Sequence, residues 1–223
     1  MIALIDTRGL RSRMWDVAAR VGSVARRALI IELRIYESIG RAIVRRPAVP
    51  RNATGFHYHR PIRVLLIVFI ALSAIEIPII DLIVHPWPVV RIGFLILGIW
   101  GLTWMVGLLC GFAMRPHTVG PIGIQVRDGL EFSVAVPWDD VESVTRISQT
   151  DEPKATRIAE VDGSRVLSVR MQDDTNVQIA LERPVEVRLP GRRPKGGRHE
   201  VDTIRLWVDD VDGYMQAVRQ HIP

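Results

Sequence analysis

Few side chains in this sequence combine the types and spacing that acid–base or metal chemistry needs. His57 and His59 bring two imidazoles together, but no carboxylate or thiol lies beside them in the sequence to complete a metal site. Aspartates cluster where turns and the start of a helix are predicted. Aspartate side chains cap backbone N–H groups at such places, and this role explains the clusters without catalysis. The clusters are Asp139-Asp140, Asp173-Asp174, and Asp209, Asp210 and Asp212.

Sequence patterns for phosphate loops, nucleophiles and disulfides are missing as well. Lys195 stands among glycines, yet no helix is predicted after it, as a phosphate-binding loop requires. Cys110 is the sole cysteine, so an intramolecular disulfide is impossible. We therefore expect no catalysis, no cofactor, no metal and no small-molecule substrate.

The residues left with chemical interest are two carboxylates inside a long apolar stretch. Glu76 and Asp81 lie on either side of Pro78, and an ionisable group at membrane depth is costly unless it faces protein or water. One interpretation is contact with a membrane protein partner or a polar pathway. The other is local: Asp81 is interfacial, and Glu76 is protonated or paired with Arg91. Partner contact or local pairing is favoured over proton chemistry.

Two apolar stretches, residues 64–84 and 89–114, are separated by a short loop. Each is long enough to cross a hydrocarbon core of ~30 Å as a helix, which takes about 20 residues, so residues 62–114 are predicted to form a transmembrane hairpin. In the second stretch, Gly107 and Gly111 form a small-xxx-small pattern that allows another helix to approach closely. That helix is either the first span or a helix of another subunit.

Arginines are concentrated before the hairpin. Residues 1–63 hold thirteen arginines against four carboxylates, and Arg115 follows the second stretch, whereas Arg91 is the one basic residue near the connecting loop. By the positive-inside rule, both termini are expected in the cytoplasm, in a multi-pass protein of the bacterial inner membrane. Membrane lipids are expected partners, but nucleic acid is not, because no folded basic face interleaved with aromatic residues is recognisable.

Residues 12–46 are predicted to form a long amphipathic helix, which Pro47 and Pro50 end. Such a helix lies on the cytoplasmic leaflet, docks on a partner protein or on another copy of itself, or packs within the chain. With a linker it makes up a basic arm over residues 1–61. Five of its arginines are candidate contacts to anionic lipid, namely Arg20, Arg26, Arg27, Arg34 and Arg41.

Alternating apolar residues replace the helical pattern after Arg115. About seven short strands are predicted, with hairpin turns at Asp128-Gly129 and Asp162-Gly163. A helix over residues 209–222, capped by Asp209 or Asp210, closes the chain. Residues 115–223 are thus predicted to form a small cytoplasmic β-barrel with a terminal helix over one end.

One segment of this region resembles a known family. Residues 130–136 run into Val136-Pro137-Trp138-Asp139-Asp140-Val141-Glu142-Ser143-Val144. This apolar-Pro-Trp-acidic turn is similar to that of bacterial pleckstrin-homology-like domains, which often follow a two-helix membrane hairpin, and the resemblance covers residues 64–223. We expect Val136 and Trp138 to point into the barrel and Pro137 to interrupt the strand. Two lysines against twenty-seven arginines indicate a GC-rich genome of the actinobacterial kind.

Eukaryotic domains of this fold bind phosphoinositides through basic residues on their first strands. Here Arg127 is the only basic residue among residues 118–137, so that mode is not expected at its usual place. The domain's one basic cluster lies in a loop before the last strand. This loop contacts anionic lipid or an acidic patch of a partner protein, or it is only solvated. Its basic residues are Arg192, Arg193, Lys195 and Arg198.

Three hypotheses of function follow. The first is a non-enzymatic accessory or scaffolding subunit of a multisubunit inner-membrane complex. Similarity to actinobacterial membrane proteins points to lipid importers of the mammalian-cell-entry type, with permease-like partners. The second is a membrane-anchored module that senses anionic lipid, and the third is a small channel or carrier built from several copies. The candidate contacts to a membrane partner are Glu76, Asp81, Gly107 and Gly111.

Overall fold

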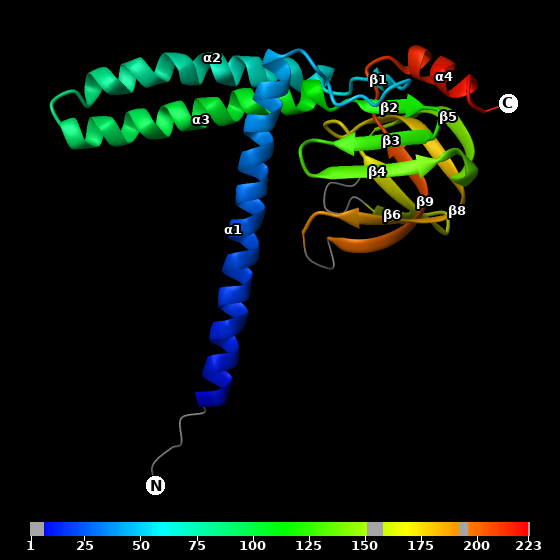
Figure 1. Ribbon diagram of the computed structural model, residues 1–223, viewed down its shortest axis with the longest axis horizontal. Helices are drawn as coiled ribbons and strands as arrows, with labels where there is room; N and C mark the ends of the chain where they lie inside the picture. The colour runs from blue at the N-terminus through cyan, green and yellow to red at the C-terminus, as the bar shows by residue number, and fades with distance from the viewer. Residues whose placement is uncertain (1–6, 151–157, 192–195, 223) are drawn as a thin grey trace, which may run out of the picture.

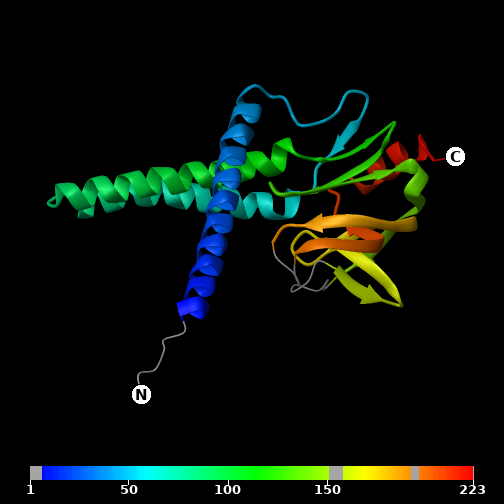
Figure 2. The ribbon, with the colours of Figure 1, turned by 60° about the horizontal axis from the view of Figure 1, so that its bottom comes forward.

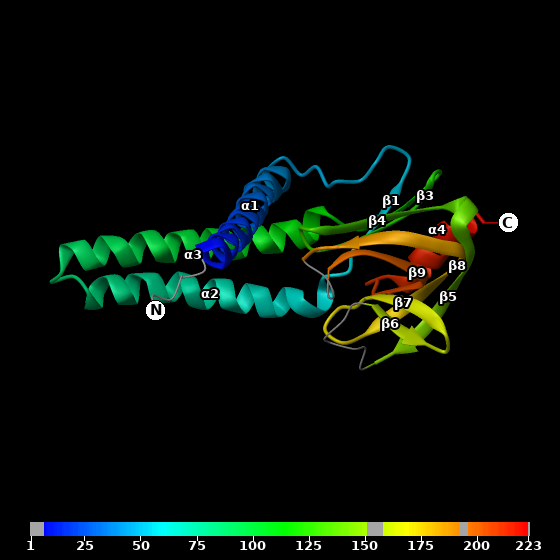
Figure 3. The ribbon, with the colours of Figure 1, turned by 90° about the horizontal axis from the view of Figure 1, so that it is seen from below.

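The computed structural model describes residues 7–150, 158–191 and 196–222, with side chains described from residue 21 onward except at residue 23. Figure 1 shows a long amino-terminal helix, a helical hairpin, and a β-rich domain with a carboxyl-terminal helix. The long helix crosses the hairpin on the side of its second helix, as Figures 2 and 3 also show. Three parts of the chain therefore meet where the hairpin joins the β-rich domain.

Helices α2 (Arg60–Ile83) and α3 (Pro88–Met114) form the hairpin. With 24 and 27 residues, both are long and apolar enough to cross a membrane, and most of their apolar side chains are exposed. Each has a proline in its first turn, where the missing N–H costs no hydrogen bond. The predicted pair of apolar helices is confirmed, and it is compatible with a membrane hairpin.

Helix α1 (Thr7–Ile43) confirms the predicted amino-terminal helix but begins and ends a few residues earlier. It ends before Pro47 because Arg45 adopts a left-handed backbone conformation, with φ of 52°. The apolar stripe of the amphipathic helix includes Val21, Val24 and Ile35, which recur at helical spacing. Ile35 is fully buried against α3, whereas Val21 and Val24 are 62% and 67% exposed. The apolar stripe thus packs against α3 near the carboxyl end of α1 and is exposed nearer its amino end.

The first sheet has the strand order β1-β2-β3-β4 and is antiparallel throughout. Strand β1 lies in the segment expected to be a linker before the hairpin, and it pairs with β2, which follows the hairpin. Both ends of the hairpin are thereby held on neighbouring strands. The four strands are β1 (Thr54–Phe56), β2 (His117–Gly120), β3 (Gly123–Asp128) and β4 (Phe132–Pro137).

The second sheet has the order β5-β8-β9-β7-β6, in which β7 and β9 are parallel and the other neighbours antiparallel. Strand β8 is continuous where the sequence predicts two strands, over residues 176–181 and 185–189, and its pairing has an irregularity between Ala180 and Val185. The turn between β6 and β7 is the predicted Asp162-Gly163, with φ of 52° and 79°. The strands are β5 (Val141–Gln149), β6 (Ile158–Val161), β7 (Ser164–Val169), β8 (Thr175–Leu189) and β9 (Gly197–Leu206).

The prediction of a closed barrel is wrong, because the described strands form two separate sheets. Pro137 offers no N–H to a ladder, and the 3-10 turn Trp138–Asp140 redirects the chain. Strand β5 therefore starts the second sheet instead of pairing with β4. At the other end of that sheet, the β6–β7 hairpin pairs with β9 and leaves β6 as an edge rather than joining β1.

The two sheets share one hydrophobic core, and helix α4 (Val211–Arg219) packs against it. Tyr214 of α4 is fully buried and meets Phe56 of β1 edge to face, with ring centroids 5.2 Å apart. Trp138 packs on the same core and donates its indole N–H to the Gly120 carbonyl at 2.9 Å. Asp210 caps α4, as predicted, by accepting the Gly213 N–H at 3.0 Å.

Candidate functional site

A groove of about 580 Å³ runs between α2 and α3, and Glu76 lies in it. Its other walls are largely apolar and include Ile80, Trp100 and Trp104. Gly101 keeps the groove open, since no atom lies within 4 Å of the position that a Cβ would take there. Within the part of the chain that the structure describes, the exposed Glu76 has neither a hydrogen bond nor an ion pair. The groove thus presents a carboxyl group on an apolar surface.

Asp81, the other carboxylate of the hairpin, has a partner in the chain. The Arg91 guanidinium donates to both of its carboxylate oxygens, at 2.5 and 2.8 Å. Asp81 lies in the last turn of α2 and Arg91 in the first turn of α3, so the hairpin connection brings them together. The local pairing considered for Glu76 is therefore made by Asp81, because Glu76 lies about 8 Å deeper along the helix.

Gly107 and Gly111 are covered by other parts of the same chain. A Cβ at Gly107 would lie 2.2 Å from Cγ2 of Ile35, so the glycine is what allows α1 to rest on α3. A Cβ at Gly111 would lie 2.5 Å from Cδ2 of Leu130, in the loop between β3 and β4. The small-xxx-small pattern is therefore used to dock α1 and the β-rich domain onto α3, rather than to pack α2.

Arginines of α1 hold the β3–β4 loop. The Arg27 guanidinium forms two hydrogen bonds with the Glu131 carboxylate, at 2.8 and 2.6 Å. Arg34 donates to the carbonyl oxygen of Leu130, whose side chain is 6% exposed. Two of the arginines predicted to contact lipid thus form contacts inside the chain, and a paired charge is less available to a headgroup.

The other residues predicted to contact anionic lipid include three whose side chains the structure describes. Arg26 is exposed, Arg41 pairs with Glu37 at 2.8 Å, and Arg198 pairs with Glu186 at 3.4 Å. Exposed pairs of this kind are weak in water and leave the cation accessible. The side chain of Arg20, and residues Arg192, Arg193 and Lys195, lie outside the described residues.

Another side of α1 faces along the hairpin, away from the β-rich domain. The Trp100 indole donates its N–H to Glu32 at 2.9 Å, which fixes this orientation. Leu29 precedes Glu32, and Tyr36 and Ile43 follow it, at helical spacing on that side; they are 60%, 48% and 77% exposed. Helix α1 thus turns basic residues to the β-rich domain and apolar residues to the opposite side, toward which the hairpin extends.

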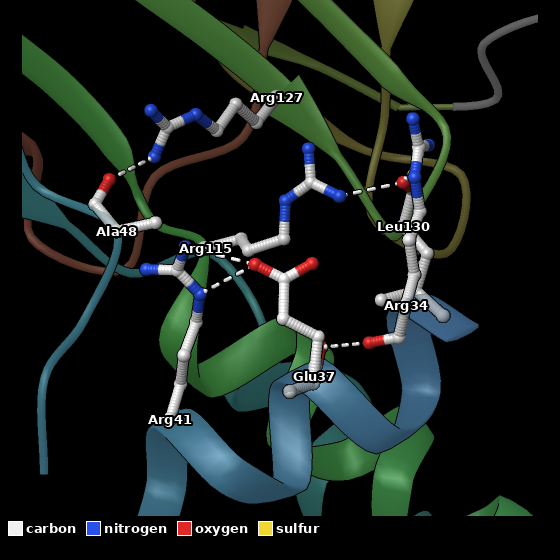
Figure 4. A network of polar contacts seen from close by, with 8 residues as sticks. Arg34, Glu37, Arg41, Ala48, Arg115, Arg127 and Leu130 are labelled. Carbon is white, nitrogen blue, oxygen red and sulfur yellow. Dashed lines mark hydrogen bonds and ion pairs between the residues drawn. The ribbon is translucent and has the colours of Figure 1, made fainter. Parts of the chain in front are cut away.

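Two arginines that the sequence did not single out as candidates join Arg34 and Arg41. Arg115 directly follows α3 and Arg127 lies in β3, and all four side chains line one cavity (Figure 4). Three elements distant in sequence bring them together, so no local pattern predicts the cluster. The available signal was Arg127 itself, a single arginine in a strand of otherwise uncharged residues before Asp128.

The residues first considered for metal chemistry have structural contacts instead, and the described part of the chain contains no cluster of three potential metal ligands. The rings of His57 and His59 lie 5.3 Å apart, edge to face. Burial, with His57 next to it, lowers the pKa of His59 below its usual value. The Asp209 carboxylate accepts the backbone N–H of Arg60 at 3.1 Å and so ties the start of α2 to the domain.

Compared with family models, curated proteins and solved structures, the chain matches none of them. The resemblance to pleckstrin-homology-like domains therefore stays a prediction based on residues 130–144.

Proposed function

We propose that this chain is a non-enzymatic accessory subunit of a larger inner-membrane complex and that its hairpin docks on another integral membrane protein. The supporting observation is Glu76, exposed in an apolar groove without a partner in the described chain. In either protonation state, a carboxyl group in a bilayer needs hydrogen-bonding partners, because lipid tails offer none. Arg91 is already engaged by Asp81.

The proposed occupant of the groove is a transmembrane helix of a different protein, with a basic or hydrogen-bond-donating side chain facing Glu76. Gly101 leaves the open space that close helix approach requires, and Trp100 and Trp104 add large apolar contacts on the same wall. The resemblance described for the sequence favours permease-like subunits of a lipid importer of the mammalian-cell-entry type as this partner class.

The proposal includes an orientation, with both termini in the cytoplasm. Helix α1 would then lie along the cytoplasmic surface, across the base of the hairpin. Its exposed Leu29, Tyr36 and Ile43 would enter the acyl boundary, since they lie on the side toward which the hairpin extends. Arg27 and Arg34 would face the β-rich domain, as they do in the structure.

The test is affinity purification of the tagged chain from native membranes in mild detergent, followed by mass spectrometry. Glu76→Leu should remove the co-purified membrane protein, and Glu76→Gln, which keeps a hydrogen-bonding group, should retain part of it. The matched controls are Glu142→Leu and Glu142→Gln, on an exposed residue of β5. Equal recovery from the Glu76 and Glu142 variants would contradict the proposal, as would recovery of only a second copy of this chain.

A membrane-anchored module that senses anionic lipid is the second candidate function, and the exposed apolar side of α1 favours it. Binding of the full chain's arm to the bilayer surface should then increase with anionic lipid and decrease with salt. Protection of α1 from proteolysis in nanodiscs, measured with and without anionic lipid, checks this. Protection that is independent of both lipid charge and salt would exclude the lipid-sensing candidate.

A further inference from the structure

Four arginines from three parts of the chain surround one cavity beside the base of the hairpin (Figure 4). Arg34 and Arg41 come from α1, Arg115 directly follows α3, and Arg127 lies in β3. The cavity has a volume of about 280 Å³. Pockets for drug-sized ligands measure ~300–1,000 Å³, so this one suits a small polar group rather than an acyl chain.

Uncharged backbone acceptors hold three of the four guanidinium groups in place. Arg34 and Arg115 both donate to the carbonyl oxygen of Leu130, in the case of Arg115 at 2.6 Å. Arg127, only 7% exposed, donates to the carbonyl oxygen of Ala48 at 2.5 Å. These bonds fix the direction of the side chains but bring no negative charge to them.

Negative charge around the cavity is scarce. Glu37 is the one carboxylate among its described lining residues, and it is paired with Arg41 at the exposed rim. Burial lowers the pKa of the Arg115 and Arg127 guanidinium groups, and repulsion from neighbouring arginines lowers it further. Several cations are thus held close together in partly dry surroundings, an arrangement that a bound anion would stabilise.

We propose that this cavity binds a phosphate group, either as the headgroup of an anionic lipid or as free phosphate. Guanidinium groups bind phosphate oxygens through paired, charge-assisted hydrogen bonds, and the uncharged Ser133 and Gln125 line the same cavity. The site lies at the end of α3 where the proposed cytoplasmic surface begins. A bound phosphate would join α1 to the β-rich domain, and this role is independent of any protein partner in the membrane.

Two measurements on the purified full chain test the proposal and distinguish the sources. The first is calorimetric titration with inorganic phosphate in phosphate-free detergent. The second is mass spectrometry of the lipid retained from micelles that contain equal amounts of phosphatidylglycerol and phosphatidylcholine. Arg41→Gln should weaken phosphate binding or phosphatidylglycerol retention by about tenfold, the effect of one charge-assisted bond. Arg51→Gln, an equal change of charge at an exposed residue outside the cavity, should change neither.

A variant that should strengthen binding controls for loss of binding through misfolding. Glu37→Gln removes the one carboxylate among the described residues that line the cavity and should strengthen binding several-fold. Binding in one measurement alone supports the site and identifies the source of the phosphate group, and binding in both supports a site that accepts either source. Absence of binding in both measurements overturns the proposal, and so does equal binding by the Arg41, Arg51 and Glu37 variants.

Discussion

Replacement of Gly107 by alanine should loosen α1 from α3. A single added methyl group would lie 2.2 Å from Cγ2 of Ile35 and 3.2 Å from Cδ1 of Ile39. Ile35 is fully buried and belongs to a helix, so it has no free direction in which to turn. Overpacking of this kind costs ~1–3 kcal/mol, against which alanine regains ~0.5–1 kcal/mol of helix propensity. A net loss of about 1–2 kcal/mol corresponds to a roughly 5- to 30-fold larger population of the undocked helix.

Hydrogen–deuterium exchange of the full chain in detergent micelles measures this population. Amides of residues 31–43 should exchange faster in Gly107→Ala by about that factor, while the core strand β9 should be unchanged. Gly101→Ala is the matched control on the same helix, because no atom lies within 4 Å of its Cβ position. In Gly107→Ala combined with Ile35→Ala, the effects should be less than additive. Equal exchange in the two glycine variants would refute the contact between α1 and α3.

Two further predictions concern the β-rich domain and are checked by urea unfolding. His117 is fully buried, and burial lowers its pKa to about 3. In the unfolded chain its pKa is about 6.5, so between these two pH values the unfolded chain binds a proton that the folded chain does not. The free energy of unfolding should therefore decrease as pH falls from 6.5 toward 3, by about 2 kcal/mol at pH 5. A stability that is constant between pH 7 and 5 would contradict a neutral, buried imidazole. Tyr58→Phe should cost about 1–3 kcal/mol at pH 7, because it removes the hydroxyl that accepts the Gly129 N–H at 3.0 Å. No change in the unfolding midpoint would show that this bond contributes nothing.

Periodicity in the sequence predicts those elements whose signal is local. The two apolar helices, the long amphipathic helix and the Asp162-Gly163 hairpin follow from composition and spacing within short windows. Strand β1 was missed because its three residues carry no alternation of their own, and only pairing with β2, across the whole hairpin, makes them a strand.

The closed barrel was a wrong expectation for a related reason. Strand lengths and turns can be read along the chain, but the partner of an edge strand depends on the whole assembly. Strand β7 pairs in parallel with β9, and this pairing extends the second sheet instead of closing a barrel.

The sequence shows which residues of the candidate site are unusual, but not which distant residues they contact. Glu76 and Asp81 stand out in an apolar sequence, but only the hairpin geometry shows that Arg91 reaches Asp81 and not Glu76. Gly107 and Gly111 indicate close packing without naming what packs there. The four-arginine cavity needed the tertiary structure, since Arg34 and Arg127 are distant in sequence.

The most direct test of the proposed docking surface is site-specific photo-cross-linking in native membranes. A photoreactive amino acid at Ile80 lies in the groove beside Glu76, and the same amino acid at the exposed Leu82 points to the opposite side of α2. A discrete adduct with a different membrane protein is expected from residue 80 and not from residue 82. Adducts with lipid alone at both positions, or with a second copy of this chain at residue 80, would contradict the proposal that this protein is an accessory subunit.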